Sequence, residues 1–223
     1  MQTVIFDLDG TLADTSGDLI AAANACFVDL GWGDLLDPVR DAGTALRGGR
    51  AMLTLGFERK GAEGQAAAAD MDAHYQKLLT HYGTNIDTHT TLYPHAMEAI
   101  GNLKAEGYRV GICTNKPEGL ARLLLTRLGV LKEFHSLIGA DTLPTRKPDT
   151  APYVAAVEQA GGSVERSLLV GDTMTDRQTS LNAGVPSVLV TFGPGAEDVK
   201  AMDPEALLSD YRHLRSVVSS LIG

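Results

Sequence analysis

The most constraining feature of this sequence is an apolar run at residues 4–6 that leads directly into Asp7, Asp9 and Gly10. A short apolar run that contains β-branched residues and has no helical periodicity is typical of a buried strand. Two carboxylates one residue apart at the end of such a strand repel each other unless a cation lies between them. Because Mg²⁺ prefers carboxylate, carbonyl and water oxygens, this strand end predicts a magnesium site.

Gly10 gives the same turn a second property. Glycine lets the backbone turn sharply and bring amide N–H groups toward an anion, which makes Gly10 a candidate for substrate binding. The strand end therefore offers a nucleophilic carboxylate, a second carboxylate, a metal site and an anion-binding turn. The alternative is an acidic turn like that of a calcium loop, but the further oxygen ligands and the closing Glu of such loops are missing.

Length and composition are those of an ordinary globular enzyme. The chain has 223 residues, 44% hydrophobic and 21% charged, enough for one core with a smaller added domain. It has no run of about 18 apolar residues and no basic segment before the first strand, so we expect a cytoplasmic protein without a membrane segment. The net charge of −9 argues against a nucleic-acid partner, although a local cationic pocket can still bind one phosphate. Cys26 and Cys113 lack metal-ligand spacing and are expected to be free thiols.

Two kinds of periodicity divide the chain. Residues 15–89 show helical spacing and no strand pattern, whereas from Tyr93 onward short apolar strands alternate with helices. This alternation predicts an α/β fold, a doubly wound parallel sheet formed by residues 1–14 and 90–223, with residues 15–89 as a small inserted all-helical domain. Helices are expected at 18–30, 42–57 with a break at 47–50, 65–82, 96–105, 118–128, 152–160, 176–183 and 209–221. Further strands are expected at 108–113, 134–139, 168–170 and 187–190.

Polar residues directly follow three of the predicted strands. Asp7 and Asp9 follow the first strand, Thr114 and Asn115 follow another, and Asp172 follows a third. Ligands of doubly wound sheets bind beyond the carboxyl ends of the strands. We therefore expect these three loops to converge at one edge of the sheet.

These segments also resemble a known family. Residues 7–12 with Asp14 are similar to the first motif of the haloacid dehalogenase-like phosphohydrolases. The second motif of that family resembles residues 114–117 (Thr-Asn-Lys-Pro). The third resembles Lys147 with the proline after it, and the fourth resembles residues 171–176 (Gly-Asp-x-x-x-Asp). All four occur in the order of that family.

The resemblance implies catalytic roles. Asp7 would be the nucleophile that forms an aspartyl phosphate, and Asp9 would be the general acid and base. Thr114, with Asn115 beside it, would hold the substrate's phosphoryl group, and Lys147 would stabilise the charge of the transition state.

The same resemblance implies how the metal is held. Mg²⁺ would be bound by Asp7, the backbone carbonyl of Asp9 and Asp172. Asp176, one helical turn after Asp172, would orient the metal ligands or Lys147.

Simpler interpretations of three of these residues remain open. Thr114 and Asp176 are also suited to cap the N-termini of the helices that follow them. Arg146 competes with Lys147 for the cationic role, and we prefer Lys147 because Pro148 follows it.

The helical insert resembles the small cap of the phosphoglycolate phosphatase and β-phosphoglucomutase branch. Arg50, in the glycine-containing segment 46–50, could bind a substrate carboxylate, or it could be a solvated charge between two helices. We expect a Mg²⁺-dependent phosphatase, a monomer or homodimer, acting on a small phosphomonoester, first of all 2-phosphoglycolate. The alternatives are a phosphosugar phosphatase, a β-phosphoglucomutase-like phosphomutase, or a non-catalytic interaction protein on the same scaffold.

Overall fold

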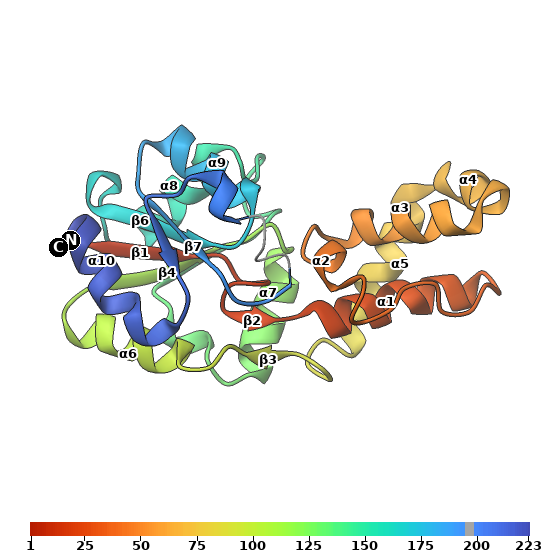
Figure 1. Ribbon diagram of the computed structural model, residues 1–223, viewed down its shortest axis with the longest axis horizontal. Helices are drawn as coiled ribbons and strands as arrows, with labels where there is room; N and C mark the ends of the chain where they lie inside the picture. The colour runs from red at the N-terminus through yellow and green to blue at the C-terminus, as the bar shows by residue number, and fades with distance from the viewer. Residues whose placement is uncertain (195–198) are drawn as a thin grey trace. The chain divides into compact units, whose positions relative to one another are not determined.

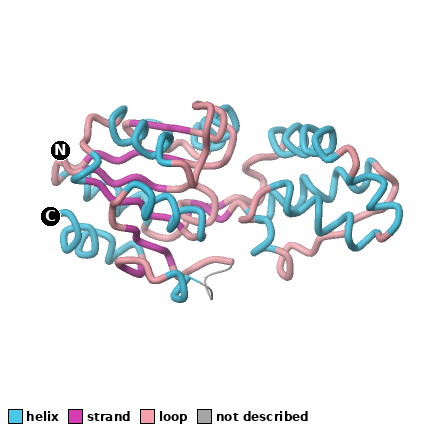
Figure 2. Tube along the Cα trace, turned by 90° about the horizontal axis from the view of Figure 1, so that it is seen from above, coloured by secondary structure: helices cyan, strands magenta, loops and turns pink. Residues whose placement is uncertain are grey.

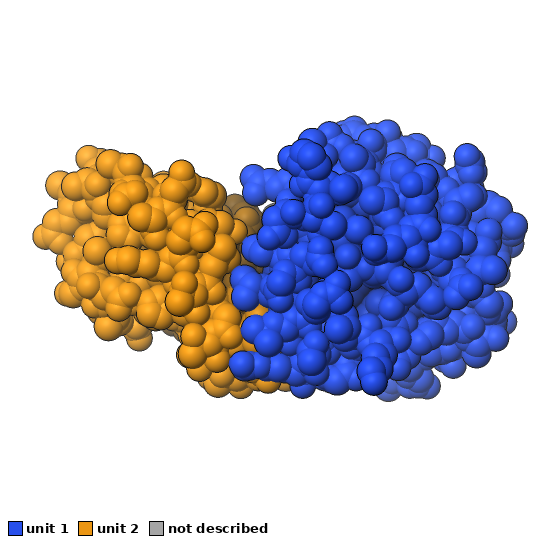
Figure 3. Space-filling view, turned by 180° about the vertical axis from the view of Figure 1, so that it is seen from behind, with its two compact units in different colours: residues 1–14, 92–223 blue, residues 15–91 orange. Residues whose placement is uncertain are grey.

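The chain folds into two compact units. The computed structural model describes residues 1–194 and 199–223. The first unit, here called the core unit, comprises residues 1–14 and 92–223, and the second, the helical unit, comprises residues 15–91 (Figure 3). The boundaries predicted from the sequence are 1–14 with 90–223 for the core unit and 15–89 for the helical unit. They differ from these only at the return into the core unit, which was predicted two residues earlier.

A six-stranded sheet forms the centre of the core unit (Figures 1 and 2). Its strand order is β5-β4-β1-β6-β7-β8, and every neighbouring pair is parallel. This confirms the predicted α/β fold with a parallel sheet. The strands are β1 (Thr3–Phe6), β4 (Arg109–Cys113), β5 (Ser136–Ile138), β6 (Ser167–Gly171), β7 (Ser187–Val190) and β8 (Ala206–Leu208).

Helices cover both faces of this sheet, which is why its central strands β1, β4 and β6 are buried along nearly their whole length. Helices α8 (Thr150–Gln159) and α9 (Met174–Ala183) pack on one face, and α6 (Ala96–Ala105) and α10 (Leu214–Ile222) pack on the other. Helix α7 (Glu118–Arg127) follows β4 and contacts β5. One cluster of the core is formed by Ile5, Cys113, Ile138, Tyr153, Ala156, Val157, Leu169 and Val185. Among its described residues the unit also contains the short 3₁₀ helices η1 (Leu131–Glu133), η2 (Val164–Arg166), η3 (Val199–Met202) and η4 (Tyr211–His213).

Strand β1 lies where the direction of winding changes. The chain proceeds from β4 to β5 on one side of β1 and from β6 through β7 to β8 on the other. Parallel sheets open a crevice beyond the carboxyl ends of the strands at such a switch point. The loops after β4, β1 and β6 therefore meet there.

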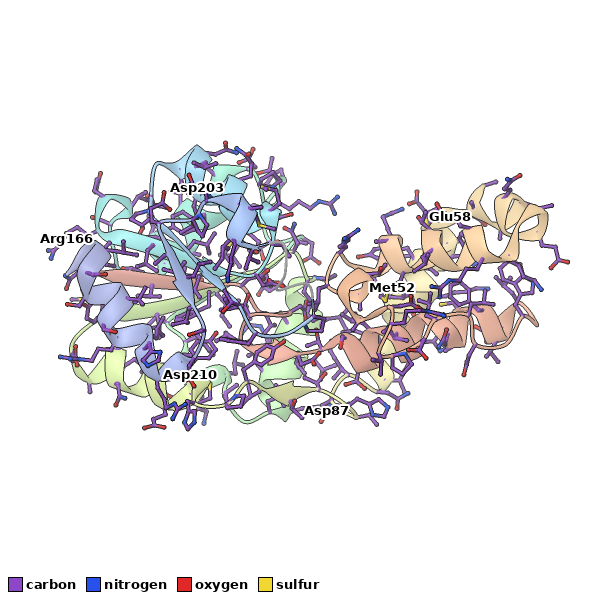
Figure 4. The ribbon with its side chains drawn as sticks, viewed as in Figure 1. Met52, Glu58, Asp87, Arg166, Asp203 and Asp210 are labelled. Atoms are coloured by element: carbon purple, nitrogen blue, oxygen red, sulfur yellow. The ribbon has the colours of Figure 1, made fainter. Side chains whose placement is uncertain are left out.

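The helical unit contains α1 (Ser16–Asp29), α2 (Ala42–Ala45), α3 (Gly49–Lys60), α4 (Ala62–Ala68) and α5 (Met71–Thr84). Its core includes an aromatic group in which the rings of Phe27 and Trp32 are 6.5 Å apart, with Phe57 edge-on to both. Figure 4 shows Met52 inside the unit and Glu58 on the outer side of α3. Two-residue strands β2 (Ala13–Asp14) and β3 (Thr91–Leu92) pair where the chain leaves and re-enters the core unit.

Asp18 links the first helix of the helical unit to the last residues of that unit. Its buried carboxylate accepts hydrogen bonds from the backbone N–H groups of His89 and Thr90 and from the Thr90 hydroxyl, at 2.7–3.0 Å. A carboxylate in the first turn also interacts favourably with the N-terminus of α1. The start of α1 is thereby held to the last residues of the unit.

Three local predictions need correction. The helix expected at 65–82 is two helices, α4 and α5. Helix α4 packs closely on α3, since a Cβ at Gly64 would lie 1.9 Å from the Phe57 carbonyl oxygen. The chain turns back after this contact, so α4 ends before α5 begins. Strand β8 was not predicted, since three residues are too few to show periodicity. The helix expected at 209–221 begins as η4 and becomes α-helical only at Leu214. In the part of the chain that the structure describes, no helix is long and apolar enough to cross a membrane.

Candidate active site

Three polar residues lie at the carboxyl ends of neighbouring strands in the core unit. Asp7 follows β1 and Thr114 follows β4, and their backbone N–H groups donate to the carbonyl oxygens of Val170 and Ile138, both at 2.9 Å. Asp172 follows β6 directly. The backbones of Asp7 and Thr114 thus continue the strand ladder one residue beyond its regular end, whereas the N–H of Asp172 donates to Oδ2 of Asp176 at 3.3 Å. The three loops converge.

Lys147, from the segment between β5 and α8, lies between two carboxylates. Its Nζ is 2.6 Å from Oδ1 of Asp176 and 3.0 Å from Oδ2 of Asp7, and only 1% of its side chain is exposed. Burial opposes the positive charge, but Asp176 and Asp7 outweigh burial and raise the pKa of Lys147. The ammonium is therefore charged at neutral pH. Arg146, the competing cation, is exposed.

Asp176 is fully buried and uses both of its carboxylate oxygens. Oδ1 accepts from Lys147, while Oδ2 accepts from the hydroxyl and the backbone N–H of Thr173, at 2.8 and 3.1 Å. Thr173 and Asp176 form a capping box at the start of α9. Asp176 thus caps the helix, as its simpler interpretation proposes, and also fixes Lys147.

The carboxylates at this edge fit a hard divalent cation. Asp7, Asp172 and Asp176 each place one oxygen within 4.8 Å of the others. Burial, reinforced by Asp176, raises the pKa of Asp172 well above its usual range, and Thr11 donates to its Oδ1 at 3.0 Å. Crowded, desolvated carboxylates of this kind are stabilised by a metal ion. Because Asp176 is engaged by Lys147 and Thr173, Asp7 and Asp172 are the side chains best placed to bind it.

Asp9 lies in a different environment from Asp7. Both of its carboxylate oxygens contact Nζ of Lys116, at 2.7 and 2.8 Å. The side chain of Lys116 is 4% exposed and that of Asp9 is 19% exposed. The two aspartates of the first strand end are therefore paired with two different buried lysines.

Thr114 and Asn115 organise the loop after β4. The Thr114 hydroxyl oxygen accepts the N–H of Lys116 at 3.2 Å, and a hydroxyl that accepts one bond still has a hydrogen to donate. Asn115 is exposed, and its amide donates to the carbonyl oxygen of Lys147 at 3.0 Å. Asn115 thus joins the loop after β4 to the segment that carries Lys147.

Comparison with known proteins identifies the family. Residues 4–190 match the model of the haloacid dehalogenase-like hydrolases. This chain belongs to that family. It is 37% identical to a phosphoglycolate phosphatase of Agrobacterium fabrum, covering 94% of this chain and 89% of the relative, and 36% identical to one of Cereibacter sphaeroides over both full lengths. A crystal structure of a predicted phosphoglycolate phosphatase from Haemophilus somnus superimposes with a TM-score of 0.82 at 25% identity, covering 97% of each chain. The family resemblance seen in the four motifs is confirmed, and the hydrolase is a phosphatase acting on phosphoric monoesters.

Lys116 of this hydrolase is the residue that sequence reasoning missed. It stands in the segment 114–117 that was singled out, two residues beyond Thr114, yet no role was assigned to it. The available indication was a cation three residues after the end of β4, the strand beside β1, whose end carries Asp7 and Asp9. The fold was needed to show that this ammonium reaches Asp9.

Two predicted substrate-binding groups of the hydrolase have partners of their own. The N–H of Gly10 donates to the carbonyl oxygen of Ala13 at 2.9 Å, and the positive φ of Gly10, 76°, allows this turn, so the binding of an anion by the turn stays a prediction. In the helical unit, Arg50 forms an ion pair with Asp72 and lies over the ring of Tyr75, 4.7 Å from its centre. The contact of Arg50 with a substrate stays a prediction.

Proposed function

We propose that this enzyme hydrolyses 2-phosphoglycolate in a Mg²⁺-dependent reaction that passes through a phosphorylated Asp7. The observation that carries the proposal is the position of the Asp7 carboxylate, which ends the central strand beside Asp172 and the charged Lys147. The choice of substrate is supported by the relatives, several of which are named phosphoglycolate phosphatases.

In the first step, Asp7 attacks phosphorus, the bond from phosphorus to the glycolate oxygen breaks, and Asp9 gives that oxygen a proton. Leu8 N–H donates to Oδ1 of Asp7 at 2.7 Å, and Lys147 lies 3.0 Å from Oδ2, so the carboxylate is held from both oxygens. Orientation of this kind lowers the barrier because the reacting groups no longer have to find each other.

In the second step, a water molecule attacks phosphorus and gives a proton to Asp9, and the bond between phosphorus and Asp7 breaks to release inorganic phosphate. Splitting one displacement into two is the advantage of a covalent intermediate. Lys147 and the Thr114 hydroxyl stabilise the negative charge of the phosphoryl oxygens in both steps. Mg²⁺, when bound by Asp7, Asp172 and the backbone carbonyl of Asp9, would supply further neutralisation of those oxygens.

The test is Mg²⁺-dependent phosphate release from a substrate panel, with Asp7→Asn as the blank. The panel holds phosphoglycolate, several sugar phosphates and nucleoside monophosphates. We expect phosphoglycolate to exceed the others by more than tenfold in kcat/KM, equivalent to about 1.4 kcal/mol of transition-state stabilisation. A preference for sugar phosphates would overturn the substrate, and full turnover by Asp7→Asn would overturn the phosphoaspartyl route.

A further inference from the structure

Lys116 is held at both ends. Its backbone N–H donates to the hydroxyl oxygen of Thr114 at 3.2 Å, and its carbonyl oxygen accepts from the N–H of Ala140 at 2.9 Å. Its ammonium contacts both carboxylate oxygens of Asp9. The base of the side chain is thus fixed by the loops after β4 and β5, while its tip reaches the loop after β1.

The backbone under Asp9 is equally well fixed. The carbonyl oxygen of Leu8 accepts the N–H groups of Thr11, Leu12 and Ala13, at 3.0–3.3 Å, and residues Asp9 and Ala13 form a β-bridge. The Asp9 side chain extends from this backbone through two rotatable bonds. A single cation in contact with both carboxylate oxygens restricts both of these bonds.

Stability alone does not account for this pair. Desolvation of two buried charges offsets much of their attraction, so a buried ion pair is weak evidence for a stabilising role. The pair lies in the same strand-end cluster as Asp7 and Thr114, where the position of a carboxylate has chemical consequences.

We propose that Lys116 is a positioning residue that holds the Asp9 carboxylate in the orientation required for proton transfer to and from the substrate. The proposal rests on the proposed function, in which Asp9 is the general acid and base. With the ammonium bound to both oxygens, one oxygen can keep this contact while the other transfers the proton. Displacing a reacting group by about 1 Å can cost on the order of a hundredfold in rate, which gives such positioning a measurable effect.

The dependence on the leaving group tests this role. The kcat/KM values of Lys116→Met and of the wild-type enzyme are compared for 2,4-dinitrophenyl, 4-nitrophenyl, phenyl and ethyl phosphate and for phosphoglycolate. A leaving group that departs without a proton does not need Asp9, so we expect a loss of less than about threefold for 2,4-dinitrophenyl phosphate. For ethyl phosphate and phosphoglycolate we expect a loss of about a hundredfold or more, the usual size of general acid catalysis.

Three further variants show whether the effect is specific to the contact between Lys116 and Asp9. Lys104→Met removes another ammonium that lies 2.6 Å from a carboxylate, that of Glu133, and should leave all five rates unchanged. Lys116→Arg should recover part of the lost rate, because it restores a cation. In an Asp9→Asn background, Lys116→Met should cause no further loss, and thermal melting of each variant reports whether it is folded.

Other outcomes overturn the proposal. An equal loss for all five substrates would mean that Lys116 acts on the phosphoryl group or on the fold. A raised KM for phosphoglycolate with ethyl phosphate unaffected would mean that Lys116 binds the substrate carboxylate. If the wild-type enzyme hydrolyses ethyl and aryl phosphates but not phosphoglycolate, the proposed substrate fails, whereas the role of Lys116 is still decided by the remaining four compounds.

Discussion

The ammonium of Lys147 lies 2.6 Å from Oδ1 of Asp176, and both side chains are excluded from solvent. Asp176 also contacts the turn after β6, through Thr173 and the backbone N–H of Asp172. The pair therefore connects the segment before α8 with the start of α9. It also holds Lys147, whose ammonium lies 3.0 Å from Oδ2 of Asp7.

Removal of Asp176 should destabilise the core unit strongly. Asp176→Ala leaves Lys147 with one carboxylate fewer and leaves the N–H of Thr173 without its acceptor, so we expect the free energy of unfolding to fall by about 3–5 kcal/mol. The double variant Lys147→Met with Asp176→Leu should lose less than the sum of the two single variants, because the attraction between these two charges is then counted only once. Urea unfolding measures all of these values.

The control for these variants is the partly exposed pair of Lys104 and Glu133, whose side chains are 27% and 45% exposed. Breaking it with Lys104→Met should change the free energy of unfolding by less than about 1 kcal/mol. Strict additivity of Lys147→Met and Asp176→Leu would show that the buried pair does not interact as its geometry indicates.

Asp7 should make the metal-free protein less stable as the pH rises. Burial, opposed by Lys147 and reinforced by Asp176 and Asp9, raises the pKa of Asp7 to about 6. The folded state therefore holds a proton that the unfolded state releases near pH 4, and stability falls between about pH 4 and pH 6. In EDTA at pH 7.5, Asp7→Asn should be more stable than the wild-type protein by about 2–3 kcal/mol, at 1.36 kcal/mol for each pKa unit. At pH 3.5 the gain should vanish.

Added Mg²⁺ provides the complementary measurement. A ligand that binds only the folded state raises its stability according to concentration and affinity. The melting temperature of the wild-type protein should therefore rise with Mg²⁺ at pH 7.5, and the rise should be smaller for Asp7→Asn and for Asp172→Asn. An equal rise in all three proteins would exclude these two carboxylates as metal ligands.

Thr114 should act through its hydroxyl. Thr114→Val keeps the shape of the side chain but removes the donor, and the loss of one donor to a developing oxyanion typically costs about 10²–10³ in kcat. Thr114→Ser keeps the hydroxyl and should retain activity within about tenfold. A rate for Thr114→Val close to that of the wild-type enzyme would leave only the loop-capping bond to Lys116 as the function of this hydroxyl.

The sequence predicted the strand-end residues because their placement follows from local rules. An apolar strand followed at once by a carboxylate or hydroxyl needs no tertiary information, and parallel strands bring their carboxyl ends together. In this way Asp7, Thr114 and Asp172 were found together with the sheet. Lys147 required the family resemblance, because no periodicity marks the segment in which it lies.

The parts that were missed depend on tertiary contacts. The pairing of Lys116 with Asp9 joins residues 107 positions apart, and nothing in either segment alone indicates it. The bond from the Gly10 N–H to the Ala13 carbonyl oxygen likewise depends on the path of the residues between them. Strand β8 exists because β7 offers it a neighbour, not because three residues prefer the extended form.

Gly171 provides a test of the site that leaves every polar group in place. A Cβ at this position would lie 2.3 Å from Cγ and 2.4 Å from Cβ of Asp176. Asp176 cannot move away freely, because Lys147 and Thr173 hold its two oxygens. Gly171→Ala should therefore displace Asp176, lower the free energy of unfolding by about 1–3 kcal/mol as overpacking does, and reduce kcat at least about tenfold.

The matched control is Gly101→Ala in α6, where a Cβ would meet nothing within 4 Å. Alanine in a helix interior is better than glycine by up to about 1 kcal/mol, so this variant should be slightly more stable and fully active. Phosphate release and urea unfolding measure both proteins. If Gly171→Ala kept the wild-type kcat, Asp176 would have room to move, and the position of Lys147 would not depend on the close packing at the end of β6.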